Sequence, residues 1–466
     1  MSAAGRVLHG GVRLLTRALG GKERTRIILL LAAVLGLSSA DVSTVGAAAS
    51  PLRHSLGINN TDIGLLVSVT SLVAAAASLP FGVLADRVRR TWTLAAAIAL
   101  WGVAMIWSAT VSSFGELLMT RLFLGGVTAA AGPLVASLVG DYFPASERGR
   151  IYGYILAGEL VGAGFGFSVT GDIAALSWQA AFVVLAVPAL ILAWFVFRMP
   201  EPGRGARADG PVHETDAQRA VRQSDVEADH TQVLERDPRG MNIIEATKYV
   251  LSIKTNVLLI LSSAAGYYFL AGVQTFGIEF TTRQYGIQQA FASALLLIVG
   301  LGAIAGVLAG GWIGDALLRR GFINARILVS AVSVVATAAL FIPPIFTRSV
   351  VTAVPYLIFA ALFLSAQNPP LDAARLDVVV PLLWGRAEAV RTCARTLGIA
   401  VAPLLFGFVS DHVFGGGRSG LQWTFAVMLL PLAGSAVLLF SGLRTYPSDV
   451  ATAAASLSAQ RQHSGS

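Results

Sequence analysis

Long apolar runs constrain the possible fold of this chain more than any other feature. Twelve runs of about 20 mostly apolar residues follow one another, and an α-helix of this length crosses the hydrocarbon core of a bilayer. The runs lie near residues 27–49, 62–84, 92–111, 116–139, 150–171 and 178–198, and then near residues 255–278, 290–312, 325–343, 352–374, 387–410 and 421–443. We therefore expect an all-α membrane protein with twelve transmembrane helices in two sets of six.

Composition agrees with this and excludes several classes of function. Charged residues make up 13% of the chain, against about 25% in a soluble domain, so lipid must cover much of its surface. The single cysteine, Cys393, can form no intramolecular disulfide, and the six histidines are too scattered for a metal site. The sequence has no phosphate-binding loop and no pairing of a nucleophile with a base. We expect neither an enzyme nor an ATP-driven pump, and no catalytic residue, metal or cofactor.

Arginine and lysine are divided unevenly between the two sets of loops, and this predicts the orientation. One set carries the basic N-terminal tail, Arg87, Arg89, Arg90, Arg148, Arg150, the segment after the sixth run, Arg319, Arg320, Arg326 and Arg386. The opposite set carries only Arg53, Arg283, Arg348 and Arg418. Both termini are therefore expected in the cytoplasm, with the protein in the inner or plasma membrane. The excess of 34 basic over 26 acidic residues reflects this topology, and nucleic acid is not an expected partner.

The spans divide the chain into five segments: a basic tail (1–26), a six-helix bundle (27–198), a linker (199–254), a second six-helix bundle (255–443) and a C-terminal tail (444–466). Between residues 199 and 240 the linker has nine acidic and six basic residues and no aromatic residue, so we expect it to remain unfolded in water. In the basic tail, apolar and arginine side chains occupy opposite helical faces. This pattern is compatible with a helix lying on an anionic membrane surface and, equally, with a solvated tail.

The two halves share a repeated pattern. The second run ends in Gly82-Val-Leu-Ala-Asp-Arg-Val-Arg-Arg90, and the eighth ends in Gly311-Trp-Ile-Gly-Asp315 followed by Arg319-Arg320. Asp141 and Arg148–Arg150 after the fourth run correspond to Asp377 and Arg386 after the tenth. Because the paired features occur in the same order in both halves, we interpret the halves as an internal repeat.

These residues resemble the major facilitator superfamily, and the resemblance covers nearly the whole chain. The segment 82–90 matches the hallmark loop of that family, except that Arg89 stands where the family usually has glycine. The resemblance implies two pseudo-symmetric six-helix bundles around a central cavity, with alternating access. It also implies a gating role for the loop charges; the alternative is that they only set topology. The gating candidates are Gly82, Asp86, Arg87, Arg90, Arg150, Asp315 and Arg319, with Asp86 bonding a helix N-terminus and Arg150.

Glycines repeat every four residues in two spans, which predicts close helix packing. Gly158, Gly162 and Gly166 lie in the fifth span, and Gly302, Gly306 and Gly310 in the eighth. Because the fifth and eighth helices meet between the bundles in the superfamily, the resemblance implies that these stripes are sliding surfaces.

A few charges lie within the predicted spans, where each costs roughly 2.5–3.5 kcal/mol on insertion scales and therefore needs a reason. Asp41 in the first span and Arg121 in the fourth are expected to pair, since these helices are neighbours in the superfamily. Burial favours the neutral acid and the arginine favours the charged one, so the pair can take up and release a proton; the alternative is a static ion pair. Glu159, in the fifth span, is a second candidate for proton coupling.

The second half contains a cluster of arginines and a small set of uncharged polar residues. Arg391 and Arg395 lie one turn apart near the inner end of the eleventh span, beside Asp372 and Arg375 of the tenth. Two interpretations remain: an inner gate that engages Asp315 or Asp377, or a site for an anionic head group. The cavity candidates are Ser38, Thr128, Tyr267, Gln274, Gln367 and Asn368. Pro369 and Pro370 should break or kink the tenth helix.

Asp41, Arg121 and the segment 57–90 also resemble the spinster-type lysolipid and sphingolipid transporters. Val42 and Thr128 depart from that pattern, which has arginine and glutamate at these positions. We therefore expect a monomeric, proton-coupled exporter of an amphiphilic or lipophilic, lysolipid-like small molecule, in contact with membrane lipids. The alternatives are uptake, a drug-type substrate, or a membrane sensor that keeps the fold without transport.

Overall fold

The structure, a computed structural model, describes residues 21–85, 88–143, 145–203, 215–222, 226–234, 238, 241–380 and 383–464. These residues form two compact units. Unit 1 comprises residues Met1–Leu56 and Val73–Gly210, and unit 2 comprises Gly57–Leu72 and Pro211–Ser466. Helix α4 (Asn60–Ala85) contributes its first part to unit 2 and its second part to unit 1.

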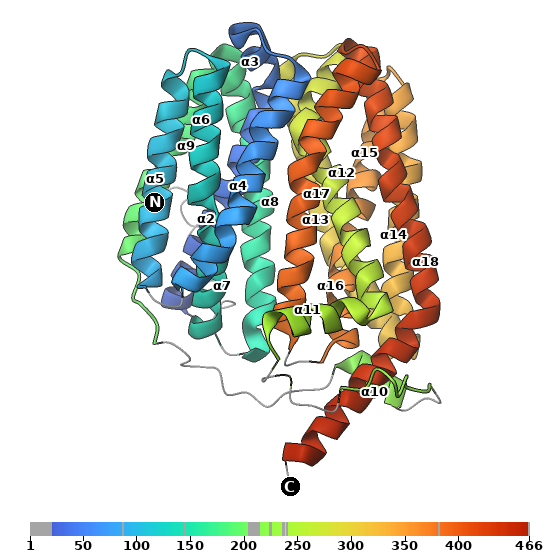
Figure 1. The fold of residues 1–466 in the computed structure, drawn as a ribbon. Coiled ribbons are helices and arrows are strands. Elements are labelled where there is room, and N and C mark those ends of the chain that lie inside the picture. The colour runs from blue at the N-terminus through green and yellow to red at the C-terminus, as the bar shows by residue number, and fades with distance from the viewer. Residues whose placement is uncertain are drawn as a thin grey trace, which may run out of the picture. The chain divides into compact units, whose positions relative to one another are not determined.

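The other helices of unit 1 are α2 (Lys22–Ala47), α3 (Ala49–Leu56), α5 (Arg90–Thr110), α6 (Phe114–Thr128), α7 (Ala131–Tyr142), α8 (Ala145–Leu176) and α9 (Trp178–Phe197) (Figure 1). Those of unit 2 are α10 (Asp216–Arg222), α11 (Ile243–Ser252), α12 (Lys254–Tyr285), α13 (Gln289–Arg319), α14 (Ala325–Phe346), α15 (Val350–Ala366), α16 (Asn368–Val378), α17 (Trp384–Phe408), the π-helix η3 (Val409–Val413) and α18 (Gly417–Ser464).

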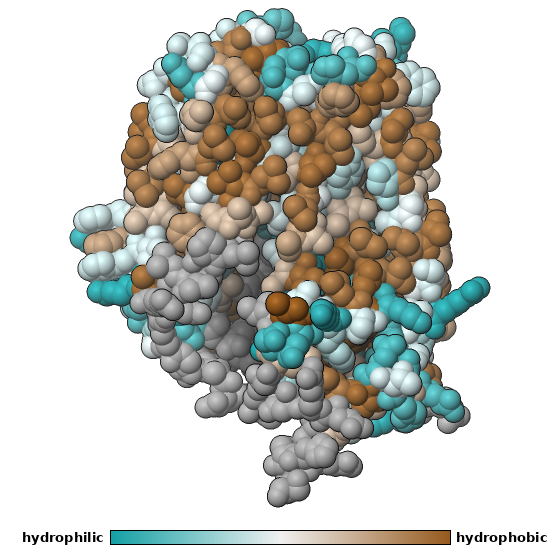
Figure 2. Space-filling view, in the orientation of Figure 1, coloured by the Kyte–Doolittle hydropathy of each residue, from teal (hydrophilic) through white to brown (hydrophobic). Residues whose placement is uncertain are grey.

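The predicted all-α membrane fold is confirmed. Within the described residues, eleven helices are long and apolar enough to cross a membrane. The remaining predicted span, 150–171, lies in α8, which is 32 residues long and whose side chains are only partly described. Large apolar side chains such as Leu308, Trp312 and Val351 are exposed on the helices. Figure 2 shows that, on the face drawn, apolar residues cover much of the helical surface and hydrophilic ones gather toward its ends.

Serine side chains fix where several spans begin. Ser113, Ser177 and Ser349 precede α6, α9 and α15, and each accepts a hydrogen bond from the backbone N–H three residues later. Such caps satisfy backbone donors that the helix leaves unpaired. The start of α4 is capped from far along the chain instead. There the Asp411 carboxylate accepts from the Thr61 backbone N–H at 2.8 Å and from Asn60 Nδ2 at 2.9 Å.

The tenth span is broken where the sequence predicted. Helix α15 ends at Ala366, Gln367 lies at the junction, and α16 begins at Asn368 with proline in its first turn. Proline is tolerated in a first turn because the N–H that it lacks would have no partner there. The tenth span is therefore two helices, α15 and α16.

The two glycine stripes do not form the sliding surfaces that the resemblance implied. Each packs on a helix of its own unit: the α8 stripe on α2, and the α13 stripe on α15. A Cβ added at Gly162 would lie 1.9 Å from the carbonyl oxygen of Gly36, and one at Gly306 would lie 1.9 Å from that of Leu362. Small residues permit close approach to any neighbouring helix, so the spacing alone did not identify the partner.

The linker also differs from the unfolded segment that its composition predicted. From Thr215 on, its described part packs on unit 2, where α10 contacts α18, whereas residues 199–203 belong to unit 1. The backbone N–H groups of Asp229 and Leu234 donate to Thr452 Oγ1 and Ser456 Oγ, both at 2.9 Å. Helix α18 continues to Ser464, through the residues expected as a C-terminal tail. Serine and threonine hydroxyls of this extension thus bond backbone groups of the linker.

The close contact between α2 and α8 yields a prediction about stability. Gly162→Ala should destabilise the protein by about 1–3 kcal/mol, the usual cost of overpacking, because its methyl group would overlap the α2 backbone. Gly126→Ala is the matched control, since a Cβ there meets nothing within 4 Å. Thermal melting of the purified protein in detergent measures both. Equal melting temperatures for the two variants would contradict the α2–α8 packing described here.

Candidate functional site

The structure brings Asp41 of α2 and Arg121 of α6 together inside unit 1. Asp41 is 3% exposed and Arg121 is 1% exposed, and Arg121 Nη1 donates to Asp41 Oδ1 at 2.9 Å. The guanidinium also lies over the Phe182 ring, 4.7 Å from its centroid. Arg121 Nε and Nη2 are buried and have no hydrogen-bond partner among the described residues. The Asp41 carboxylate therefore accepts a hydrogen bond from only one of the three guanidinium nitrogens of Arg121.

Two of the cavity candidates line a small hollow in the same unit. Ser38 and Thr128 contribute to a cavity of about 30 Å³, together with Trp101 and mostly aliphatic side chains. A volume of this size holds about one water molecule or one methyl group. The indole N–H of Trp101 is buried without a partner among the described residues. The hollow is thus mostly apolar, with few polar groups. Glu159 lies on α8 and is half-buried.

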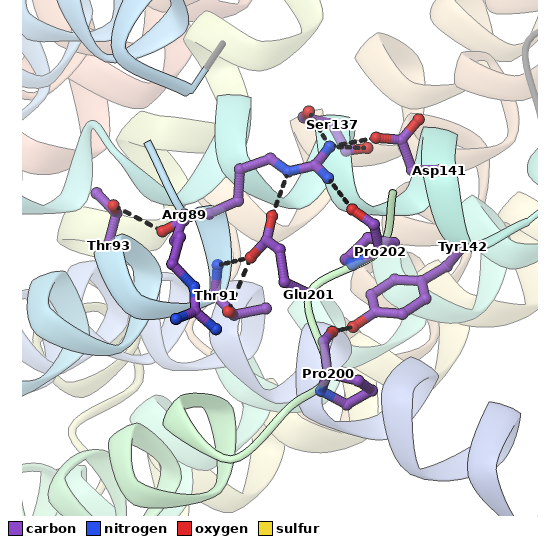
Figure 3. Close-up of polar contacts among 10 residues, drawn as sticks. Arg89, Thr91, Thr93, Ser137, Asp141, Tyr142, Pro200, Glu201 and Pro202 are labelled. Carbon is purple, nitrogen blue, oxygen red and sulfur yellow. Dashed lines mark hydrogen bonds and ion pairs between the residues drawn. The ribbon is translucent and has the colours of Figure 1, made fainter. Parts of the chain in front are cut away.

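Arg90 holds one end of unit 1 together. It begins α5, is 1% exposed, and donates to Ser137 Oγ at 2.9 Å and to the Asp141 carboxylate, both on α7. Its other nitrogens donate to Glu201 Oε1 and to the backbone oxygen of Pro202, each at 2.9 Å, in the segment after α9 (Figure 3). One guanidinium thus links α5, α7 and the exit of α9.

Glu201 caps α5 in the same network. It accepts from the Thr91 backbone N–H at 2.9 Å and from Thr91 Oγ1 at 2.8 Å. Burial alone would raise the pKa of the Glu201 carboxyl, but the hydrogen bonds from Thr91 and Arg90 outweigh it and hold the pKa below its ordinary value. A carboxylate at a helix N-terminus is also favoured by the helix dipole. Glu201 was not among the residues predicted from the sequence, although its position directly after a span was an available signal.

Parts of the predicted gate lie outside the described residues. Asp86 and Arg87 are not described. Gly82 and Arg150 lie in α4 and α8, but their surroundings are not described. The predicted contact between Asp86 and Arg150 therefore stays a prediction.

Unit 2 contains a counterpart of the Arg90 network. Arg326, near the start of α14, donates to Asp315 at 3.0 Å at the end of α13 and to the Asp377 carboxylate near the end of α16. Tyr446 Oη of α18 donates to Asp377 at 2.6 Å. The internal repeat could have predicted this role, because Arg326, like Arg90, lies at the start of the helix that follows the hallmark loop. The loop of the second half is longer, so the correspondence between the two arginines was not recognised from the sequence. Arg319 is exposed at the end of α13.

The gate interpretation required Arg391 and Arg395 to engage Asp315 or Asp377, but neither arginine contacts these acids in the structure. Arg326 already occupies both carboxylates. Arg391 instead pairs with Asp372 of α16 and with Glu388 of its own helix, the latter at 2.8 Å. Arg395 lies over the Tyr267 ring, 4.8 Å from its centroid. Residues one turn apart on α17 therefore face α16 and α12.

The uncharged candidates of unit 2 have different surroundings. Gln367 is buried at the α15–α16 junction, where its side-chain amide donates to the Leu364 carbonyl oxygen at 2.9 Å. It therefore terminates α15 as well as being a cavity candidate. Gln274 on α12 and Asn368 on α16 are half-buried.

The Glu201 contacts predict a pH dependence of stability. Because the folded-state pKa of Glu201 is lowered, its carboxylate stabilises the fold fully above about pH 4.5 and loses this contribution as the pH falls through the folded-state value. Glu201→Gln should therefore melt at a lower temperature than the wild type at pH 7, and the gap should narrow below about pH 4.5. Glu227→Gln, at an exposed glutamate, is the control. A gap that stays constant across this range would refute the assignment.

Comparison with known proteins identifies the family. The Major Facilitator Superfamily profile matches residues 31–374. The chain is 24% identical to the hexuronate transporter of Bacillus subtilis (strain 168), over 84% of this chain and 89% of that protein. It is 26% identical to protein spinster homolog 1 of Xenopus laevis, over 87% of this chain and 76% of that protein.

A solved structure has the same fold. This is the crystal structure of a bacterial homolog of the human lysosomal transporter spinster, in an inward-facing and unoccupied conformation. It aligns with a TM-score of 0.74 and 18% identity, over 92% of this chain and 98% of that one. The predicted resemblance to the superfamily and to spinster-type proteins is confirmed, and the relatives are transporters, not enzymes. The chain belongs to the Major Facilitator Superfamily.

Proposed function

We propose that this protein is a proton-coupled secondary transporter of an amphiphilic small molecule that carries an acidic group. The observation that carries the proposal is the buried Asp41–Arg121 pair, joined by one hydrogen bond of 2.9 Å. Ionised groups inside a membrane protein are costly, and they often mark ion or substrate pathways.

The geometry of the pair suits a coupling element. Burial favours a neutral Asp41, whereas the neighbouring guanidinium favours an ionised one, so the protonation state depends on how closely the two approach. Only Nη1 of Arg121 is engaged, and Nε and Nη2 have no partner among the described residues. Protonation of Asp41 would weaken the remaining contact with Arg121, and release of the proton would restore the pair.

The surroundings of the Asp41–Arg121 pair and the relatives of the chain both bear on the kind of solute transported. The hollow beside Ser38 and Thr128 is lined mostly by aliphatic side chains, which favours an apolar portion of the solute. A hexuronate is an organic acid, and the relative from Bacillus subtilis is named for its transport. Export of a lysolipid-like cargo is the expectation from the sequence, whose resemblance to spinster-type proteins agrees with these relatives. Uptake of an organic acid is the second candidate, because one relative is named for hexuronate transport.

The proposal predicts the behaviour of an Asp41→Asn variant in proteoliposomes. A fluorescent single-chain lysophospholipid and radiolabelled glucuronate serve as the two cargo probes, under pH gradients of either sign and with sodium replaced by choline. An imposed gradient should accelerate wild-type transport. In Asp41→Asn the ratio of rates with and without the gradient should fall to about one, because the amide cannot take up the proton.

Asp172→Asn is the matched control, since Asp172 is an exposed aspartate in the same unit. It should keep the wild-type ratio. An unchanged gradient dependence in Asp41→Asn would exclude proton coupling at this pair. The probe that is transported, and the sign of the effective gradient, distinguish export of an amphiphile from uptake of an organic acid.

A further inference from the structure

Three arginines and two carboxylates meet within unit 2, and the coupling proposed for Asp41 and Arg121 does not involve them. Asp372 and Arg375 lie on α16, and Glu388, Arg391 and Arg395 lie in the first half of α17. We call these five residues the α16–α17 cluster. Because Arg326 holds Asp315 and Asp377, the arginines of the cluster do not contact the two acids that the gate interpretation named.

Most of the charge in the cluster is paired internally. Arg391 bridges Asp372 and Glu388, and Arg375 holds the other carboxylate oxygen of Glu388. Thr392 adds a hydrogen bond of 3.1 Å to Glu388 Oε1. Asp372 Oδ1 and both carboxylate oxygens of Glu388 are therefore engaged by two of the three arginines.

The third arginine is in excess. Arg395 makes no ion pair among the described residues, and its guanidinium lies over the Tyr267 ring, 4.8 Å from the ring centroid. An aromatic face attracts a cation but does not neutralise its charge. With every group ionised, the cluster carries one uncompensated positive charge.

Unused hydrogen-bond donors accompany this excess charge. Arg375 is 6% exposed and Arg391 is 8% exposed, yet Arg375 Nε and Nη1 and Arg391 Nε have no partner among the described residues. The same holds for Arg395 Nε. Leaving buried guanidinium donors unpaired is costly, and one ligand with several acceptor oxygens would satisfy them together.

We infer that the α16–α17 cluster binds the anionic group of the transported solute, a carboxylate or phosphate with a single negative charge. One negative charge balances the cluster, whereas the two resident carboxylates repel a more highly charged anion. The planar forks of arginine match the oxygens of carboxylate and phosphate. This inference rests on the proposed function and names the part of the solute that unit 2 recognises.

Equilibrium binding tests the site without requiring transport. The full chain is purified in a maltoside detergent at about pH 5, where a phosphate monoester carries about one negative charge. Its melting temperature is titrated with dodecyl phosphate, inorganic phosphate and 1-dodecanol. The first two share a head group and differ in the chain; the first and third share the chain. Dodecyl phosphate should stabilise the wild type, as a ligand of the folded state does, and dodecanol should not.

Three substitutions assign the effect to the cluster. Arg395→Gln should weaken dodecyl phosphate binding at least about tenfold, the size of one good charged contact. Arg320→Gln, which removes the same charge at an exposed position, should change it less than about twofold. Asp372→Asn should instead strengthen binding, because it frees Arg391 from a competing carboxylate. A purely structural cluster would not gain affinity from this change.

The outcomes separate the possible sources of the anion. Stabilisation by dodecyl phosphate alone supports the site with an amphiphile as its ligand, and equal stabilisation by inorganic phosphate supports it with a water-soluble anion. Equal losses in Arg395→Gln and Arg320→Gln, or equal effects of dodecanol and dodecyl phosphate, would overturn the inference. If Arg395→Gln does not fold, Arg395→Met, which also removes the charge, carries the same comparison. Because no pH gradient is involved, a failure of proton coupling at Asp41 leaves this result unaffected.

Discussion

Each buried arginine among the residues that the structure describes is paired with a carboxylate from another part of the chain, and this pairing organises both units. Arg90, Arg121, Arg326 and Arg391 are each less than a tenth exposed. Each is held by an acid on a different helix or segment. A guanidinium cannot lose its proton under ordinary conditions, so a helix that buries one must bring a partner with it. In unit 1 the pairs join α2 to α6 and α5 to α7; in unit 2 they join α14 to α13 and α16, and α17 to α16.

The internal repeat explains why two of these networks are alike. Arg90 and Arg326 open equivalent helices, and each reaches an aspartate near the end of the next span, Asp141 or Asp377. The networks differ in what completes them. Glu201 caps the first, whereas Tyr446 donates to the acid of the second, and Gln218 of the linker donates to the Asp377 backbone oxygen at 2.9 Å. The linker is therefore tied directly to the network of unit 2.

Some features of the site could be predicted because the bilayer restricts the alternatives. Charges inside apolar runs are few, so Asp41 and Arg121 had few possible partners on neighbouring helices. The break at Gln367 followed from two adjacent prolines, each of which removes a backbone hydrogen bond from a helix interior. Other features were mispredicted because several partners were equally compatible with the pattern. The glycine stripes allowed contact with any helix. One interpretation paired the arginines of α17 with Asp315 or Asp377, whereas Arg391 pairs with Asp372 and Glu388. The charged linker was expected to stay in water, yet Gln218 is fully buried.

The sequence by itself determined that this chain spans a membrane many times, where the spans lie, and that its halves are repeats. It could do so because span length, proline and the scarcity of charge act locally, along one segment of chain. Only the tertiary structure decided which acid meets which arginine, which helix each glycine stripe touches, and that Arg395 is left without an ion pair among the described residues. These depend on how each helix is rotated about its axis and packed on its neighbours. That rotation is set by the whole bundle, and no single segment encodes it.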